Sequence, residues 1–254
     1  MSVVSSSVCH VLREDPDLAD AIPPDRRRQA VEDCTAPELS LQPGRWGGRG
    51  SLGFRGGIGV LVMGGLMIRR VGIDGRYGAE LIGEGDLLRP DEESISPLLP
   101  LTTDWSIVLP TRVAALDLDF EQHLAQYPEL GRRLIARALQ RSKNLSVNMA
   151  IVHQARVDVR LHMLLWHLAA RWGRVRSDGT VLRLRLTHAV LADLVAARRP
   201  TVTTALSELT RRGVVTTDGE TWILSGESPR DVIPLARAST RDAGETASPS
   251  GAGG

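Results

Sequence analysis

Two arginines and four hydroxyl side chains within ten residues are the part of this sequence best suited to chemistry. They are Arg198, Arg199, Thr201, Thr203, Thr204 and Ser207. Val202, Leu206 and Leu209 recur at helical spacing, so on a helix the polar residues occupy the opposite face. Arginine and compact hydroxyl side chains hydrogen-bond to phosphates and to base edges. The pattern predicts a helix that enters the major groove of DNA, with Arg198 on a phosphate.

The residues on either side of this helix predict the elements that position it. Thr187 is a good N-cap for a preceding helix with one apolar face. Ala196 and Ala197 form a turn, and Pro200 suits the first turn of the second helix because it has no N–H to satisfy there. Residues 214–224 are two β-prone runs around Asp218-Gly219. The order is that of a winged helix-turn-helix.

Positive charge is concentrated around this motif. From Arg156 to Arg230 there are twelve arginines and seven acidic residues, whereas the whole chain has a net charge of +1. Because phosphates attract clustered arginine, this excess favours double-stranded DNA as the partner. One alternative is that the helices and hairpin only pack within some α+β domain. Another is a sensor or scaffold protein whose winged helix mediates protein contacts.

Composition limits the remaining possibilities. A chain of 254 residues with 42% hydrophobic content has room for two modest cores. Cys9 and Cys34 are the only cysteines and no histidines cluster, which argues against a disulfide framework, a zinc site or an iron-sulfur cluster. The N-terminus lacks the regions of a signal peptide, and the longest apolar run, residues 58–68, is too short to cross a bilayer. We therefore expect a cytoplasmic protein without a membrane partner.

The N-terminal half of the chain is expected to be rich in strands. Residues 15–36 have helical character with a break at Pro23-Pro24, and residues 45–57 are a glycine-dense loop. Residues 59–88 then alternate short β-prone runs with the turn signals Gly64-Gly65, Asp74-Gly75 and Gly85-Asp86. Such spacing suggests a β-roll or barrel, which strands at 105–109 and 113–116 would close.

A long helix follows, from Pro128 to about Ala155. Its apolar seam steps by three or four residues, with two polar interruptions, through Leu130, Leu134, Ala138, Arg141, Leu145, Asn148 and Val152. A seam of this kind predicts a coiled-coil dimer held by Leu134, Ala138, Leu145, Asn148 and Val152; the alternative is an ordinary amphipathic helix on the roll. Ile135, Leu139 and Ile151 form a second apolar side. Residues 227–254 have the composition of a disordered tail.

From about Arg13 to Gly226 the sequence resembles the CRP/FNR family of transcriptional regulators. The resemblance rests on residues 61–66 and 85–87, on Trp105 and Phe120, on residues 127–130, and most firmly on residues 186–209 and 219–223. It implies an α+β fold with a cyclic-nucleotide-binding-like β-roll (residues 1–127), a dimerisation helix (128–155), a winged helix-turn-helix (156–226) and a tail (227–254). The implied partners are operator DNA, a second copy of the chain and RNA polymerase.

Two departures from the family pattern lie in the helix-turn-helix. Ala196 stands where relatives have glycine, and Pro200 where glutamate often follows the recognition arginine. Thr204 also replaces a second base-reading arginine. We expect DNA binding to persist with an altered operator preference.

The roll departs from the family pattern at the site for the cyclic nucleotide. Relatives bind the phosphate of cyclic AMP with a Gly-Glu pair after the Gly-Asp turn and an Arg-Ser pair farther on. Here residues 85–88 are followed by Arg89-Pro90, and no lysine or arginine occurs from Pro90 to Thr111, a stretch that carries Asp91, Glu92, Glu93 and Asp104. Ser146 matches the serine that touches adenine, but Leu145 replaces its hydroxyl neighbour. We predict no binding of cyclic AMP in the usual way; the effector of the roll, if it has one, stays undefined.

Enzymatic function has little support in the sequence. The GxGxxG pattern of residues 48–53 has no strand before it and no helix after it, so we interpret it as a loop and not as a dinucleotide site. His162 and His167 lie on an apolar helix predicted for residues 157–170 and are better explained by packing than by ligation. No GxSxG, HExxH or Walker lysine occurs. We expect neither catalysis, nor a cofactor, nor a metal.

Overall fold

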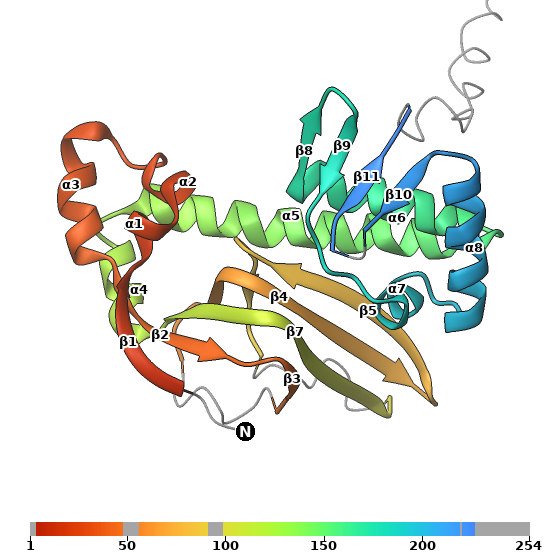
Figure 1. The fold of residues 1–254 in the computed structure, drawn as a ribbon. Coiled ribbons are helices and arrows are strands. Elements are labelled where there is room, and N and C mark those ends of the chain that lie inside the picture. The colour runs from red at the N-terminus through yellow and green to blue at the C-terminus, as the bar shows by residue number, and fades with distance from the viewer. Residues whose placement is uncertain (1–3, 48–55, 91–98, 219, 227–254) are drawn as a thin grey trace, which may run out of the picture.

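The computed structural model describes residues 4–47, 56–90, 99–218 and 220–226. Figure 1 shows an N-terminal β structure, a long helix that runs beside it, and a C-terminal unit of helices and short strands near the end of that helix. We call residues 4–116 the roll and residues 157–226 the winged unit. The predicted α+β order of roll, long helix and winged helix-turn-helix is confirmed.

The described strands of the roll belong to one antiparallel sheet in the order β1-β2-β7-β4-β5, with β3 paired to β7 and β6 paired to β4. They are β1 (Val4–His10), β2 (Thr35–Leu41), β3 (Gly44–Trp46), β4 (Gly59–Ile73), β5 (Arg76–Gly83), β6 (Leu87–Leu88) and β7 (Leu101–Leu116). Alternate residues of these strands turn inward around Trp46 and Trp105, whose rings meet edge to face at 5.5 Å. This cluster is the interior of the roll.

Strand β4 is continuous over 15 residues, although Gly64-Gly65 has the sequence of a turn. Its register against β7 shifts between Val62 and Met67, so the two glycines form a bulge. Gly65 has a φ of +96°, and a Cβ there would lie 2.3 Å from the carbonyl oxygen of Pro110. The prediction of separate short strands here, and at 105–109 and 113–116, is therefore wrong, because the bulge keeps both long strands continuous.

Short helices close the left end of the roll in Figure 1. They are α1 (Val11–Glu14), α2 (Pro16–Ala19), α3 (Pro24–Asp33) and α4 (Leu118–Leu124). The helical region predicted for residues 15–36 ends at Asp33, because the chain then enters β2, and strand β1 was not predicted. Cys9 and Cys34 lie buried in this region, where burial raises the pKa of Cys34 to about 12.

Helix α5 (Pro128–Val152) is the long helix of the sequence prediction and ends three residues earlier than expected. Its first turns bury Leu130 and Leu134 in a cluster with α1 to α4. Arg137 reaches back to α2, where its Nη2 donates to Asp15 Oδ1 at 2.8 Å. The helix is thus anchored to the N-terminal helices at its beginning.

Four residues, 153–156, separate the winged unit from α5. Its helices are α6 (Val157–Trp172), α7 (His188–Leu194) and α8 (Arg199–Arg211), and its strands are β8 (Gly173–Arg176), β9 (Gly179–Leu182), β10 (Val215–Thr217) and β11 (Trp222–Leu224). The strands form a second antiparallel sheet in the order β10-β11-β9-β8. The hairpin β8–β9 was not predicted. Within the described ranges, no helix is long and apolar enough to cross a membrane.

The winged unit packs directly on the roll. One buried cluster contains Leu66, Ile68 and Leu81 of the roll together with Leu161 and other residues of the winged unit. Close packing continues at the end of α6, where a Cβ on Gly83 would lie 2.8 Å from the ring of Trp172. A buried contact of this kind fixes how the helix-turn-helix sits on the roll.

Candidate nucleic-acid interface

The helix-turn-helix depends on a tight turn between α7 and α8. Thr187 caps α7 by accepting a hydrogen bond from the amide of Val190 at 3.2 Å. After α7, Ala196 takes a φ of +49°, a left-handed conformation that costs an alanine roughly 1–2 kcal/mol. Arg160 braces this turn, since its Nη1 donates to the carbonyls of Val195 at 3.0 Å and Ala196 at 3.3 Å. The turn therefore keeps its geometry without the usual glycine.

Helix α8 separates an apolar face from a polar one, as its sequence predicts. Val202, Leu206 and Leu209 are buried against the rest of the winged unit. The six predicted contact residues are all exposed on the other side: Arg198, Arg199, Thr201, Thr203, Thr204 and Ser207. Pro200 occupies the first turn. Nothing in the described part of the chain covers this face.

The hydroxyl groups on this face donate to their own helix. Thr203 donates to the carbonyl of Arg199 at 3.1 Å, and Thr204 donates to that of Pro200 at 3.2 Å. Ser207 does the same with Thr203. The oxygens of Thr204 and Ser207 keep lone pairs that can accept further hydrogen bonds, whereas Thr203 Oγ1 also lies 2.9 Å from His188 Nδ1. Arg198 and Arg199 have no side-chain partner among the described residues. The face thus offers two unpaired cations and several acceptors.

The wing is stabilised by its turn but carries acidic residues. Asp218 Oδ1 accepts from the amides of Glu220 at 3.0 Å and Thr221 at 2.7 Å, and these bonds lower the pKa of Asp218. Trp222 fills the space beneath, where its Nε1 donates to the carbonyl of Leu184 at 3.0 Å. The two carboxylates at the tip, of which that of Glu220 lies 3.7 Å from Arg185, make the wing a poorer surface for an anion than the unpaired arginines at the start of α8.

The predicted dimerisation seam on α5 is only partly available. Leu134 is 2% exposed and packs within its own chain, so it is not free to contact a partner. Asn148 Nδ2 donates to the carbonyl of Ala79 at 3.0 Å, which ties it to the roll. Leu145 and Val152 are half-buried, and Ala138 is exposed. For Leu134 and Asn148 the structure supports the alternative, a helix face that packs on the roll.

The outer side of α5 carries exposed apolar residues instead. Ile135 is 62% exposed, Leu139 60% and Met149 63%. With Ser142 and Ser146 between them, they step by four, three, four and three residues along the helix. The sequence pattern placed Ile135, Leu139 and Ile151 on a second apolar side. For Ile151 this is wrong, since it is 2% exposed and packs in the cluster that joins the roll to the winged unit.

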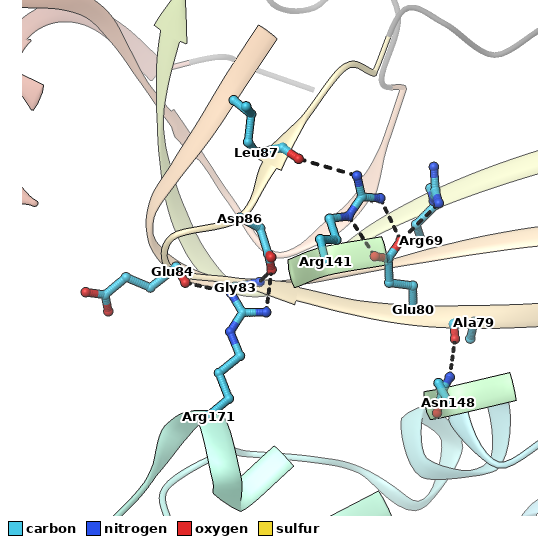
Figure 2. Close-up of polar contacts among 10 residues, drawn as sticks. All are labelled: Arg69, Ala79, Glu80, Gly83, Glu84, Asp86, Leu87, Arg141, Asn148 and Arg171. Atoms are coloured by element: carbon cyan, nitrogen blue, oxygen red, sulfur yellow. Dashed lines mark hydrogen bonds and ion pairs between the residues drawn. The ribbon is translucent and has the colours of Figure 1, made fainter. Parts of the chain in front are cut away.

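The junction between roll and α5 is filled by ion pairs (Figure 2). Glu80 lies between two arginines: Arg141 binds both carboxylate oxygens at 2.7 Å, and Arg69 approaches to 3.0 Å. Burial lowers the pKa of Arg69, while hydrogen bonds and charge from Glu80 outweigh burial and raise that of Arg141. Arg141 also donates to the carbonyl of Leu87 at 3.4 Å. The carboxylate of Glu80, on β5, is thus held by two arginines where the roll meets α5.

A second ion pair joins the winged unit to the Gly85-Asp86 turn (Figure 2). Arg171 of α6 lies 2.9 Å from Asp86 and donates to the carbonyl of Glu84 at 2.8 Å. Asp86 also accepts from the amide of Gly83 at 2.9 Å. Burial raises the pKa of Asp86, and Arg171 opposes that shift. The Gly85-Asp86 turn of the roll is thus bound to the winged unit.

The other residues considered in the sequence include two histidines on α6. In the residues that the structure covers, no three His, Cys, Asp or Glu side chains are placed to hold a metal. His162 accepts from Trp166 Nε1 at 3.0 Å, and burial lowers the pKa of both His162 and His167. Residues 48–53 and Asp91, Glu92 and Glu93 lie outside the described residues.

The chain is similar to known proteins in its sequence and in its fold. A family model described as a Crp-like helix-turn-helix domain matches residues 159–227. The CRP-like cAMP-activated global transcriptional regulator of Mycobacterium tuberculosis is 30% identical over 173 residues, which cover 65% of this chain and 74% of that protein. Among solved structures, a cyclic nucleotide-binding domain containing protein from Listeria monocytogenes has a TM-score of 0.60 at 13% identity, covering 82% of this chain and 96% of the other. A CooA mutant from Carboxydothermus hydrogenoformans has a TM-score of 0.56 at 13% identity, covering 89% and 94%.

Proposed function

Because the chain belongs to the CRP/FNR family of transcriptional regulators, which bind DNA and are not enzymes, we propose that it acts as a homodimer that reads an inverted-repeat operator. We further propose that cyclic AMP does not control it. The observation that carries the first proposal is the uncovered polar face of α8, with Arg198 and Arg199 unpaired among the described residues.

DNA recognition is tested by selecting bound fragments from a random duplex library with the purified protein. We expect enriched fragments to share two half-sites about 10 base pairs apart, centre to centre, since that separation places two recognition helices in successive major grooves. A salt titration of the best fragment measures the number of phosphate contacts. A library without enrichment, together with salt-independent binding, would overturn the proposal.

The outer side of α5 supports the proposed dimer. Ile135, Leu139 and Met149 are large apolar side chains left in water, and together with Ser142 and Ser146 they follow the three- and four-residue spacing of a two-helix seam. Ser142 and Ser146 lie between them and allow two helices to approach closely. We assign the interface to this side rather than to Leu134 and Asn148, which the roll already uses.

Leu139→Glu tests this interface by placing two carboxylates opposite each other. We expect the variant to be a monomer by light scattering and to lose operator affinity, because half-site binding lacks the second recognition helix. Arg133→Glu adds the same side chain to an exposed position of α5 off this seam and should leave a dimer. A dimeric Leu139→Glu protein would place the interface elsewhere.

Two features support the proposal that cyclic AMP is not the effector, in contrast to the cAMP-activated Mycobacterium tuberculosis relative. Pro90 has no N–H for a phosphate, and the carboxylate of Glu80, held by Arg69 and Arg141, occupies the roll's contact with α5. A bound phosphate would have to displace or oppose that charge. Arg89, which follows the Gly85-Asp86 turn in the sequence and donates to the carbonyl of Gly57 at 3.2 Å, is the residue that would have to compensate.

Calorimetry with cyclic AMP and cyclic GMP tests this part of the proposal. We expect no heat of binding at micromolar nucleotide concentrations. If the protein binds either nucleotide at micromolar concentration and Arg89→Ala abolishes that binding, Arg89 holds the phosphate. The proposal that cyclic AMP does not control the protein would then be wrong.

A further inference from the structure

A cavity of about 290 Å³ lies between the winged unit and the roll, away from α8 and away from the interior of the roll. Gly65, Leu66 and Leu109 of the roll line one side, where the bulge of β4 meets β7. Trp172 lines it at the end of α6. The volume is close to the lower limit for cavities that bind small organic ligands.

Three arginines line the opposite side of this cavity: Arg174, Arg176 and Arg183. Arg174 pairs with Val181 across β8 and β9, so its side chain shares a face of the sheet with that of Val181. Arg176 lies two residues farther along β8 and points to the same face, whereas Arg183 lies one residue past the end of β9 and also lines the cavity. Because β8 and β9 are antiparallel, Arg176 and Arg183 lie on opposite sides of the Arg174–Val181 pair, so the three arginines are spread along this hairpin beside the cavity.

These arginines are left without neutralising partners. None of the three makes a side-chain hydrogen bond or ion pair within the described part of the chain, and Glu84 is the only acidic residue that lines the cavity. By contrast, Arg171 next to them is paired with Asp86. Three like charges beside an apolar wall repel each other and focus a positive potential in the cavity. That arrangement favours an anion.

We propose that this cavity binds a small organic polyphosphate of mononucleotide size. Its phosphates would be held by Arg174, Arg176 and Arg183 through charge-assisted hydrogen bonds, and its flat apolar part would lie against Leu66 and Leu109. The site is separate from the one between α5 and the roll interior. Such a ligand contacts both the roll and the winged unit and therefore stabilises their docked arrangement.

DNA is a poorer occupant of this cavity than a small anion. Strand β8 is at the edge of the sheet opposite β10, the strand that follows α8, and four strands place the two edges roughly 14 Å apart. The roll forms the facing wall, and a duplex is far too wide to enter a space of about 290 Å³. DNA bound to α8 would therefore leave these arginines available.

Calorimetry of the full chain tests the proposal, with inorganic tripolyphosphate and ATP as probes. We expect one site per chain, tighter for ATP than for tripolyphosphate, and roughly tenfold weaker binding in Arg176→Ala and in Arg183→Ala. Both side chains are exposed and unpaired, so these variants should fold. Arg28→Ala removes an exposed arginine on α3 and should bind like the unsubstituted protein.

The outcomes separate this inference from the proposed function. If Arg199→Ala abolishes probe binding and Arg183→Ala does not, the anion occupies α8 and the inference is wrong. If neither probe binds but Arg176→Ala and Arg183→Ala lower affinity for all duplexes, the arginines contact DNA and the inference is also wrong. Operator selection with the unsubstituted protein is unaffected by either result.

Discussion

Arginine has opposite uses in two regions of this molecule. Where the roll, α5 and α6 meet, Arg137, Arg141 and Arg171 each bind a carboxylate: Asp15, Glu80 and Asp86. On the surface of the winged unit, another set has no side-chain partner among the described residues: Arg174, Arg176, Arg183, Arg198 and Arg199. The residue type alone therefore does not reveal its role.

The difference follows from solvent exposure for Arg137 and Arg141, whose side chains are 16% and 17% exposed, whereas the more exposed Arg171 is paired because Asp86 lies beside it. A buried arginine must be paired, because an unpaired charge in a dry environment costs several kcal/mol. An exposed arginine is solvated by water, so it can stay unpaired within the protein and bind an external anion. The paired set fixes the architecture, and the unpaired set marks the surfaces to which we assign DNA and a small polyphosphate.

The largest effect is expected from breaking a paired arginine. Arg141→Ala leaves Glu80, 10% exposed at its side chain, with only Arg69 as a partner. We expect the free energy of unfolding to fall by about 3 kcal/mol, measured by urea denaturation. Arg174→Ala, an unpaired exposed arginine, should change it by less than about 0.5 kcal/mol. Equal losses would remove the distinction between the two sets.

The unpaired arginines of α8 should instead affect DNA binding without affecting stability. Arg199→Ala should cost about 1–3 kcal/mol of operator affinity and relax base preference, because a bidentate contact with guanine is lost. Arg198→Ala should weaken all duplexes alike and reduce the salt dependence. The measurement is a salt titration on operator and on random DNA. Unchanged affinity in both variants would rule out α8 as the recognition helix.

Local sequence signals predicted the winged helix-turn-helix because each of them acts within a few residues. The cap at Thr187, the proline at position 200 and the apolar stripe of Val202, Leu206 and Leu209 determine helix ends and faces without help from distant residues. The exposed face of α8 follows from that stripe. The same reasoning missed β8–β9, although Asp178-Gly179 is a turn dipeptide and Arg174-Val175-Arg176 alternates polar and apolar residues.

Features that depend on distant pairing could not be predicted. Gly64-Gly65 is compatible with a turn or a bulge, and only the pairing of β4 with β7 decides. Likewise, the period of α5 identifies two apolar sides, but the choice between Leu134 and Leu139 depends on which side the roll covers. Arg70 and Asp193, 123 residues apart, form an ion pair at 2.7 Å that no sequence spacing indicates.

A smaller effect is expected at the turn that Arg160 braces, where a paired arginine supports the DNA-binding surface. Ala196→Gly should stabilise the protein by roughly 0.5–1 kcal/mol, because glycine adopts a φ of +49° without steric cost. Part of this gain is offset because glycine loses more conformational entropy than alanine on folding. Ala197→Gly is the matched control and should destabilise by about as much. Thermal unfolding measures both. A destabilised Ala196→Gly protein would show that Arg160 has removed the strain.

The smallest effect is expected in the pH dependence of stability, through two buried histidines of α6 that lie near arginines without bonding to them. Burial, followed by the charge of Arg212, lowers the pKa of His162, with Asp158 opposing; burial and Arg171 lower that of His167. A histidine whose pKa is lower in the folded state than the usual 6.5 contributes stability that is complete above pH 6.5 and is lost as the pH falls through the folded pKa. His162 can accept from Trp166 only while its Nε2 is unprotonated. We therefore expect thermal stability to decline below pH 6.5, and the decline to be shallower in His162→Gln, which cannot be protonated. Equal slopes in the two proteins would mean that His162 does not contribute.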